Sequence, residues 1–237
     1  MVSPWLGILS YGVVIHKREE SSSGSTPKVI GLTGGIGAGK SSVARILHDH
    51  GCVVFDADEA VRGILKTDSA VREKLISWWG SGIINDEGKV DRRRVAQFVF
   101  VEDGERKRLE GLLHPMVEKR RNQLWEDAGR EAKQAGRRIA AFVIDAPLLF
   151  EVGLDKKCDA VIFVDASEEI RLNRVREGRG WRAEELKNRE RAQWSVDMKR
   201  EKSDFIVENE GSFDDLRSEV RVVLEKIVAG VGGKGFA

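Results

Sequence analysis

The sequence predicts an α/β protein of three layers, in which helices cover both faces of a parallel sheet of five strands. Short apolar runs alternate along the chain with longer stretches of helical periodicity, and this order produces parallel sheets. The runs are continuous rather than interrupted by polar residues, which is typical of strands covered on both faces. A glycine-rich segment, residues 34–39, lies between the first run and a helical pattern. It predicts a tight turn at the carboxyl end of the first strand.

The expected strands are spread over the whole chain. They are Lys28–Thr33, Cys52–Asp56, Ile139–Asp145, Ala160–Asp165 and Phe205–Glu208. The first helix is expected over Lys40–His50, directly after the glycine-rich segment.

More than eighty residues separate the second expected strand from the third. This is too long for a loop and has helical periodicity, so we expect a helical insertion over residues 60–137. Apolar residues recur at helical spacing around Leu109, Leu113 and Val117. Pro115 interrupts this pattern, and because proline lacks the backbone N–H, we expect a new helix to begin there.

The two ends of the chain differ in composition from the segment between them. We expect an N-terminal extension and linker over residues 1–27, a main domain over residues 28–229 and a flexible glycine-rich tail over residues 230–237. The apolar stretch Trp5–Ile15 is far shorter than the ~20 residues that span a bilayer. We therefore expect it to be an added strand or an upstream extension.

The overall composition excludes several classes of protein. Lys and Arg number 40 against 39 Asp and Glu, and charged residues make up 33%, so a generally basic nucleic-acid binder and a membrane protein are not expected. Cys52 and Cys158 are the two cysteines of the chain, which is too few for a disulfide framework. We expect a cytoplasmic protein.

The glycine-rich segment continues into Lys40 and Ser41 and matches G-x-x-x-x-G-K-[ST], the phosphate-binding P-loop. Glycines let successive backbone N–H groups point at phosphate oxygens. The following helix presents its positive end to the same anion. Lysine reaches the β- and γ-phosphates, and the serine hydroxyl is a ligand for Mg²⁺. The expected fold is therefore that of the P-loop nucleoside-triphosphate hydrolases, and the chain is expected to bind a nucleoside triphosphate.

Two carboxylates, Asp56 and Asp58, follow the second strand. Ligands of open parallel sheets bind beyond the carboxyl ends of the strands, so both should face the P-loop. A kinase that phosphorylates an alcohol needs a carboxylate to accept the hydroxyl proton, and Asp58 is the candidate. The alternative is that one of the two aspartates only caps the next helix. Arg62 lies one turn after Asp58 and could contact a substrate phosphate.

A third carboxylate, Asp145, ends the third strand. P-loop enzymes place an acid there near Mg²⁺ or its water ligands. The alternative is a cap of the next turn.

Five arginines are concentrated after the fourth strand: Arg171, Arg174, Arg176, Arg179 and Arg182. Such a run is usually a solvated helix face. In a P-loop kinase it can instead be a lid, here over residues 171–202, whose guanidinium groups close onto the transferring phosphoryl group. A further helix is expected from about Arg182 to Lys202.

Several segments, in this order and at similar spacing, together resemble the dephospho-coenzyme A kinase family. They are LTGGIGAGKSS, VFDAD, VDRRRVAQFVF, LLHP, APLLFE, VIFVD, RAQW and FIVENEG. The resemblance extends roughly from Val29 to Leu224. It implies a P-loop kinase with a helical region for the coenzyme A moiety and a lid.

The family resemblance also implies the reaction, which is phosphorylation of the ribose 3′-hydroxyl of dephospho-coenzyme A by ATP, the last step of coenzyme A biosynthesis. It implies Mg²⁺ as cofactor and ATP and dephospho-coenzyme A as partners. We expect a monomer that binds neither nucleic acid nor membrane. The alternatives are another nucleoside or nucleotide kinase with this core, or a nucleotide-binding module without catalysis.

The family's site residues are carried over where this sequence matches. The ATP site is expected to comprise Gly34, Gly37, Ala38, Gly39, Lys40, Ser41, Ser42 and Asn209. Asp58, Lys40, Arg174 and Arg176 are the expected catalytic residues. Asp58, Arg62 and His114 are expected to bind substrate, although a helix-entry role for His114 is an equal alternative. Ser41 and Asp145 are the expected metal ligands. The lid departs from the family pattern, which leaves Arg174, Arg176 and Arg179 as alternatives for the arginine on ATP.

Overall fold

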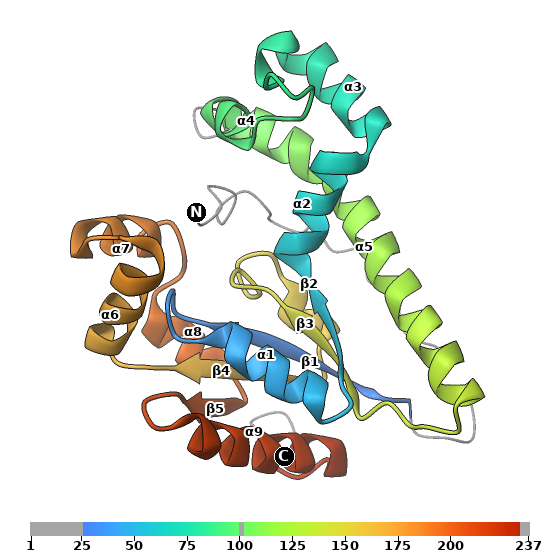
Figure 1. Ribbon diagram of the computed structural model, residues 1–237, viewed down its shortest axis with the longest axis vertical. Coiled ribbons are helices and arrows are strands. Elements are labelled where there is room, and N and C mark those ends of the chain that lie inside the picture. Colours follow the sequence, from blue (N-terminus) through green and yellow to red (C-terminus); the bar gives the residue numbers. More distant parts are fainter. Residues whose placement is uncertain (1–25, 100–101, 233–237) are drawn as a thin grey trace.

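The computed structural model describes residues 26–99 and 102–232, and in these residues it contains a sheet of five parallel strands (Figure 1). The strands are β1 (Lys28–Gly34), β2 (Val53–Asp56), β3 (Ala141–Asp145), β4 (Ala160–Asp165) and β5 (Phe205–Glu208). Their order across the sheet is β2-β3-β1-β4-β5. The predicted α/β fold and its five parallel strands are confirmed.

Strand β1 occupies the centre of the sheet and is buried almost throughout. Successive side chains enter opposite layers, as the two-residue repeat of a strand requires. Val29 belongs to the core on one face, while Ile30 and Leu32 belong to the core on the other. Both faces are therefore covered, which explains why the strand sequences are continuously apolar.

Helices α1 (Lys40–Asp49) and α9 (Phe213–Ala229) pack against each other over one face of the sheet (Figure 1). The other face is contacted by α8 (Val196–Lys202) and by the long helix α5 (Asp103–Gln134). These helices form the outer two of the three layers.

The segment between β2 and β3 is helical, and most of it projects from the sheet as a lobe, although α5 also runs along the sheet (Figure 1). It consists of α2 (Ala57–Thr67), α3 (Ser69–Trp79), the 3₁₀ turn η1 (Ser81–Ile83), α4 (Arg92–Val99) and α5. Trp79 joins three of these helices, because it stacks on Phe98 of α4 and donates a hydrogen bond to Glu105 of α5 at 2.6 Å.

Helix α5 corrects the expected helix start at Pro115, since it runs without interruption through that residue. Pro115 removes one helical hydrogen bond to the carbonyl of Gly111. Leu109, Leu113 and Val117, on either side of the proline, are fully or almost fully buried against the neighbouring core. Tertiary packing therefore maintains the helix where local sequence preference would end it.

The helix expected from Arg182 to Lys202 is also corrected. It is two helices, α7 (Ala183–Glu190) and α8, and they follow α6 (Glu168–Arg179). The chain leaves helical geometry after α7 because two backbone N–H groups bond to side chains instead. Trp194 N–H donates to Glu151 at 2.9 Å, and Ser195 caps α8 by accepting from Met198 N–H at 3.2 Å.

Most residues of the predicted N-terminal extension and C-terminal tail lie outside the part of the chain that the structure describes. Residues 1–25 of the expected extension and residues 233–237 of the expected tail lie outside the described residues. Within residues 26–99 and 102–232, no helix combines the length and apolar character that crossing a membrane requires.

Candidate active site

The P-loop connects the end of β1 to the start of α1, and its backbone conformation depends on glycine. Gly37 and Gly39 have φ angles of 81° and 92°, which side chains with a Cβ rarely adopt. A Cβ at Gly37 would also lie 2.8 Å from the carbonyl oxygen of Arg171, and one at Gly39 would collide with the side-chain amide of Asn209. Both glycines are therefore required by conformation and by space.

The first turn of α1 is left open to an anion. Gly39, at the N-cap position, has no side chain to accept from the N–H groups of the first turn, and that turn contains no acidic residue. These N–H groups and the positive end of the helix are therefore available to phosphate oxygens.

Lys40 and Asp145 form an ion pair at the bottom of this site. Lys40 Nζ donates to a carboxylate oxygen of Asp145, which ends β3 and is 6% exposed. Burial raises the pKa of Asp145, and the neighbouring Lys40 opposes that increase. The expected strand-end acid thus lies directly beside the P-loop lysine.

Ser41 and Asp145 suit the requirements of Mg²⁺ bound together with a triphosphate. Ser41 lines the central cleft, and Asp145 contributes a buried carboxylate next to Lys40. Mg²⁺ prefers oxygen ligands and usually keeps several waters, so one or two protein oxygens and the phosphates suffice. The described residues contain no group of three or more His, Cys, Asp or Glu side chains that could hold a metal by itself.

Asp56 and Asp58 differ in role although one residue separates them. Asp56 caps α2, because its side chain accepts from the backbone N–H of Glu59 at 2.8 Å. Asp58 lies in the first turn of α2 and lines the cleft together with Lys40. Both aspartates line the cleft, but the Asp56 carboxylate is engaged as the cap of α2, which leaves Asp58 as the candidate for the base.

Burial is the main influence on the Asp58 carboxyl group and raises its pKa. Lys40 opposes this effect, Asp56 adds to it, Arg62 opposes it, and Asp145 adds to it. A carboxylate with a raised pKa is a stronger base than an ordinary aspartate.

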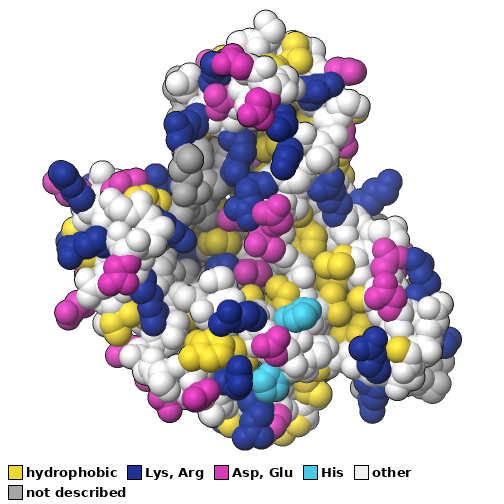
Figure 2. All heavy atoms as spheres, in the orientation of Figure 1, with side chains coloured by type: hydrophobic (Ala, Val, Ile, Leu, Met, Phe, Trp, Pro, Cys, Tyr) yellow, Lys and Arg dark blue, Asp and Glu magenta, His cyan; other side chains and the backbone are white. Residues whose placement is uncertain are grey.

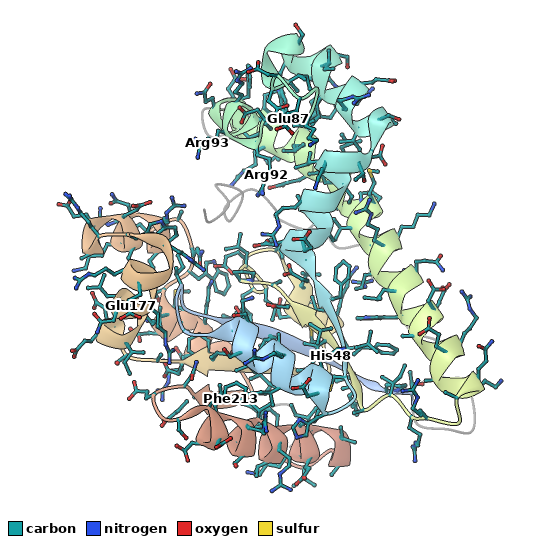
Figure 3. The ribbon with its side chains drawn as sticks, in the orientation of Figure 1. His48, Glu87, Arg92, Arg93, Glu177 and Phe213 are labelled. Atoms are coloured by element: carbon teal, nitrogen blue, oxygen red, sulfur yellow. The ribbon has the colours of Figure 1, made fainter. Side chains whose placement is uncertain are left out.

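Arg62 lies one turn after Asp58 and contributes a positive charge to the same cleft. Its guanidinium group binds the exposed carboxylate of Glu59 at 2.7 Å. Figure 3 shows Arg92 of α4 pointing from the insertion toward the cleft. Burial, and after it the charge of nearby Arg62, lower the pKa of Arg92 to about 10 against the opposing effect of Asp58 and Glu59. Arg92 is not among the residues predicted from the sequence, although it lies in one of the segments that carry the resemblance.

The P-loop, Asp58 and Arg62 border a cleft of about 670 Å³. Figure 2 shows a hollow in the middle of the molecule, with Lys and Arg and also Asp and Glu side chains along its border. Its lining residues come from the P-loop, from α2, from the turn after β3, from α6 and from the segment after β5. They include Gly34, Gly37, Gly39, Lys40, Ser41, Ser42, Asp58, Arg62, Pro147, Arg174, Arg179, Asn209 and Phe213.

The arginines of the predicted lid have different surroundings. Arg174 lines the cleft and donates to the carbonyls of Ala38, at 3.1 Å, and Asn209, at 2.9 Å. Arg179 lines the cleft as well. Arg176 is exposed on α6 and is not one of the lining residues. Arg171 is buried and paired with Glu190, so its role is to connect α6 with α7.

Asn209 and Phe213 border the end of the cleft beyond the P-loop. The side-chain amide of Asn209 donates to the carbonyl of Ala38 at 2.7 Å. Phe213 begins α9 (Figure 3), and the guanidinium groups of Arg45 and Arg217 lie 4.9 Å and 5.2 Å from its ring centroid. Phe213 is not among the residues predicted from the sequence, because a single aromatic residue at a helix start has no distinctive pattern.

His114 is not brought to the cleft. It lies on α5 near Lys157 and Glu118, and burial followed by the charge of Lys157 lowers its pKa to about 4. It is not one of the residues that line the cleft.

Residues 28–215 match the sequence model of a family described as CoaE: Dephospho-CoA kinase. Among curated proteins, the chain is 36% identical over 200 residues to a dephospho-CoA kinase of Arabidopsis thaliana, with 84% of each chain covered. It is 35% identical over 198 residues to one of Geobacillus kaustophilus, covering 83% of this chain and 95% of the relative.

Solved structures give the same result for the fold. The crystal structure of TT1252 from Thermus thermophilus superposes with a TM-score of 0.70 at 33% identity, and it covers 84% of this chain and 97% of that one. The dephospho-CoA kinase from Campylobacter jejuni superposes with a TM-score of 0.51 at 26% identity, with the same coverage. From the matched residues, the identity to curated members and the P-loop fold, we conclude that this chain belongs to the dephospho-CoA kinase family.

Proposed function

We propose that this chain transfers the γ-phosphoryl group of ATP to the ribose 3′-hydroxyl of dephospho-coenzyme A, the final step of coenzyme A biosynthesis. One observation supports this most directly: Asp58, a base candidate, lines the same cleft as Lys40 and Ser41 of the P-loop. The cleft thus offers an acceptor-side carboxylate and a phosphate-binding loop together, which phosphoryl transfer to an alcohol requires.

In this proposal the triphosphate binds at the start of α1. The P-loop N–H groups hold its oxygens, and Lys40 turns from Asp145 toward the β- and γ-phosphates. Mg²⁺, when bound with ATP, would neutralise phosphate charge and be held by Ser41 and by Asp145, directly or through water. The base would lie near Asn209 and Phe213.

Asp58 orients the acceptor and removes its proton. The ribose 3′-oxygen attacks the γ-phosphorus while the bond to the β–γ bridging oxygen breaks. ADP leaves with that electron pair, and Asp58 takes the hydroxyl proton. Arg174 and Arg179, which line the cleft, stabilise the charge on the transferring group. Arg176 would need a movement of α6 to reach it.

The insertion supplies the acceptor side of the cleft. Arg62 lines the cleft, and Arg92 points toward it from α4. We propose that Arg62 binds a phosphate group of dephospho-coenzyme A, because one guanidinium group can donate two parallel hydrogen bonds to two oxygens of a phosphate. The expected monomer and its cytoplasmic location remain predictions.

The test is ADP release by the purified protein with Mg²⁺ and ATP, in the presence and absence of dephospho-coenzyme A, with AMP and adenosine as competing acceptors. We expect release that depends on dephospho-coenzyme A and a product heavier by one phosphate in mass spectrometry. Turnover on AMP or adenosine alone would reassign the acceptor. ATP binding without any acceptor-dependent release would contradict the proposed activity.

A further inference from the structure

A buried lysine outside the predicted ATP and acceptor residues connects three segments around the cleft. Lys199 of α8 is 1% exposed. Its ammonium group donates to the carbonyl of Pro147 at 2.7 Å and to the side-chain carbonyl of Gln193 at 3.1 Å, and it pairs with Glu151 at 2.8 Å. An ammonium group has three N–H donors. All three are therefore matched by acceptors inside the protein.

The partners of Lys199 lie on two segments, the turn after β3 and the segment between α7 and α8. Pro147 lines the cleft two residues after Asp145, and its carbonyl also accepts from the hydroxyl of Thr33, at the end of β1, at 3.2 Å. Glu151, at the other end of this turn, accepts from the backbone N–H of Trp194. Lys199 thus connects the turn after β3 to the segment between α7 and α8.

The same group also borders a second, smaller cavity of about 340 Å³ behind the P-loop. Its lining includes Gly35 of the P-loop, Glu190 at the end of α7, Gln193, Trp194 and Lys199. The cavity leaves space between the P-loop and the predicted lid at this point. At this point the hydrogen bonds around Lys199 add to the apolar packing of Ile36 against Val175, Trp181 and Leu186, which also holds the lid near the P-loop.

The physical cost of this arrangement indicates a role beyond packing. Transferring an ammonium group from water into the protein interior carries a large free-energy cost. A buried ion pair is therefore often no more stabilising than apolar residues of similar volume. The ion pair and its hydrogen bonds instead fix the relative position of two segments, because three acceptor oxygens on those segments must all lie within hydrogen-bond distance of one ammonium group.

We propose that Lys199 is a positioning residue for phosphoryl transfer. Its ammonium group holds the turn at Pro147, and with it the Asp145 end of β3, in register with the P-loop, and it fixes the return segment of the lid at Gln193. This inference rests on the proposed function, because it assigns Lys199 to the same transfer step. Lys199 acts through Pro147 and Gln193 and does not touch the reacting atoms.

The central variant is the double substitution Lys199→Met with Glu151→Gln. It removes the buried positive charge and the negative charge together, and glutamine can still accept from Trp194 N–H. Lys199→Met alone leaves the Glu151 charge buried, so we expect it to lower Tm, and the double variant should recover most of that loss. Lys226→Met, at an exposed position on α9, is the control and should match wild type in Tm and kcat.

If Lys199 has a positioning role, the double variant recovers Tm but not turnover. We expect kcat to fall roughly 10–100-fold, the scale for small misplacements in an active site, with KM for ATP within about 3-fold of wild type. Recovery of both Tm and kcat would overturn the proposal and leave Lys199 a structural role.

A second variant covers the case in which the double variant does not fold. Gln193→Leu removes one acceptor and keeps the Lys199–Glu151 pair. We expect a small loss of Tm, because one buried N–H loses its acceptor, together with a several-fold lower kcat, and an unchanged kcat would overturn the proposal. The acceptor that supports wild-type turnover is used throughout, or acceptor-independent ATP hydrolysis if none does. A failure of the wild-type protein on dephospho-coenzyme A therefore contradicts the proposed function alone.

Discussion

At the scale of single residues, the start of α2 separates two neighbouring aspartates. Asp56 lies at the N-cap, where its carboxylate accepts from a backbone N–H. Asp58 lies inside the first turn and does not cap the helix, although both aspartates line the cleft. The difference arises from helix geometry, because only the N-cap side chain can reach back to the first N–H groups.

Replacing Asp58 with asparagine tests the base. Asp58→Asn keeps the size of the side chain but cannot accept the proton, so we expect kcat to fall ~10²–10⁴-fold, the usual range for a general base. The Kd of ATP should change little. Steady-state kinetics and calorimetric titration measure the two quantities. Asp68→Asn, which keeps the cap of α3, is the matched control, and wild-type turnover in Asp58→Asn would refute the assignment.

The pH dependence of the reaction provides an independent check. Burial raises the pKa of Asp58 above its ordinary value of 3.8. Only the deprotonated carboxylate accepts a proton, so activity should be present above the raised pKa and lost as the pH falls through it. The acid limb of kcat/KM should therefore lie above pH 3.8. A limb at or below that value, with the protein still folded by circular dichroism, would contradict the raised pKa.

The sequence alone could identify residues whose role depends on local pattern. The P-loop spacing predicted Gly34, Gly39 and Lys40, and the strand ends predicted Asp58 as a candidate. It could not choose between capping and catalysis for Asp58, because both follow from an acid near a helix start. Lys199 was missed because it lies in a run of charged residues, KREK, where burial has no local signal.

At the scale of elements, the turn between β1 and α1 depends on close approach of backbone to side chain. Gly39 combines a φ of 92° with the side-chain amide of Asn209 directly beside it. The amide of Asn209 in turn bonds to the carbonyl of Ala38. The P-loop and the segment after β5 therefore form one unit, although about 170 residues separate them.

Gly39→Ala is expected to disrupt this unit. The new Cβ would strain the backbone and displace Asn209, so the Kd of ATP should rise at least about 10-fold, with a loss of Tm. Fluorescence titration with a labelled nucleotide measures the affinity. Gly129→Ala, inside α5 and with open space around it, is the control and should preserve affinity. Unchanged nucleotide affinity in Gly39→Ala would show that the loop tolerates a side chain here.

Helix α5 continues through Pro115, although a proline inside a helix locally favours its end. Pro115→Ala restores an N–H in the middle of α5, so we expect the free energy of unfolding to rise by about 1–3 kcal/mol. The rise is smaller than the full penalty of a proline inside a helix, because alanine also increases the conformational entropy of the unfolded chain. Urea unfolding followed by circular dichroism measures it. A decrease would mean that the geometry imposed by the proline contributes to packing.

Element boundaries show where local reasoning is insufficient. The strands were predicted to within two residues because buried parallel strands are continuously apolar. The continuity of α5 through Pro115 was not predictable, since it depends on contacts with helices distant in sequence. The break between α7 and α8 depends on Glu151, which lies more than forty residues before it.

At the scale of the whole molecule, strand order brings the site together. Strand β3 lies between β2 and β1, so the carboxyl ends of all three meet at one edge. Asp56 aligns with Asp145 across β2 and β3, and Leu32 of β1 aligns with Asp145. Ligand binding at this edge should therefore stabilise the fold as a whole.

This coupling predicts a shift in stability on binding. With Mg²⁺ and ATP at 100 times Kd, the free energy of unfolding should rise by about 2.7 kcal/mol. The rise should be largely lost in Lys40→Ala, which weakens engagement of the γ-phosphate. Chemical denaturation at several ATP concentrations measures the effect. A concentration-independent stability in the wild-type protein would contradict binding at this site.

The direct junction of β2 with α2 has a consequence for how the family can vary. Strand β2 ends at Asp56 and α2 begins at the next residue, so helical phase, at ~100° per residue, sets the direction of Asp58. One inserted residue before Asp58 would turn its carboxylate away from the cleft. Beyond Thr67, where α2 ends, the insertion is not under this constraint. The part of the insertion after α2 can therefore diverge in length and sequence while the Asp58 carboxylate keeps its orientation.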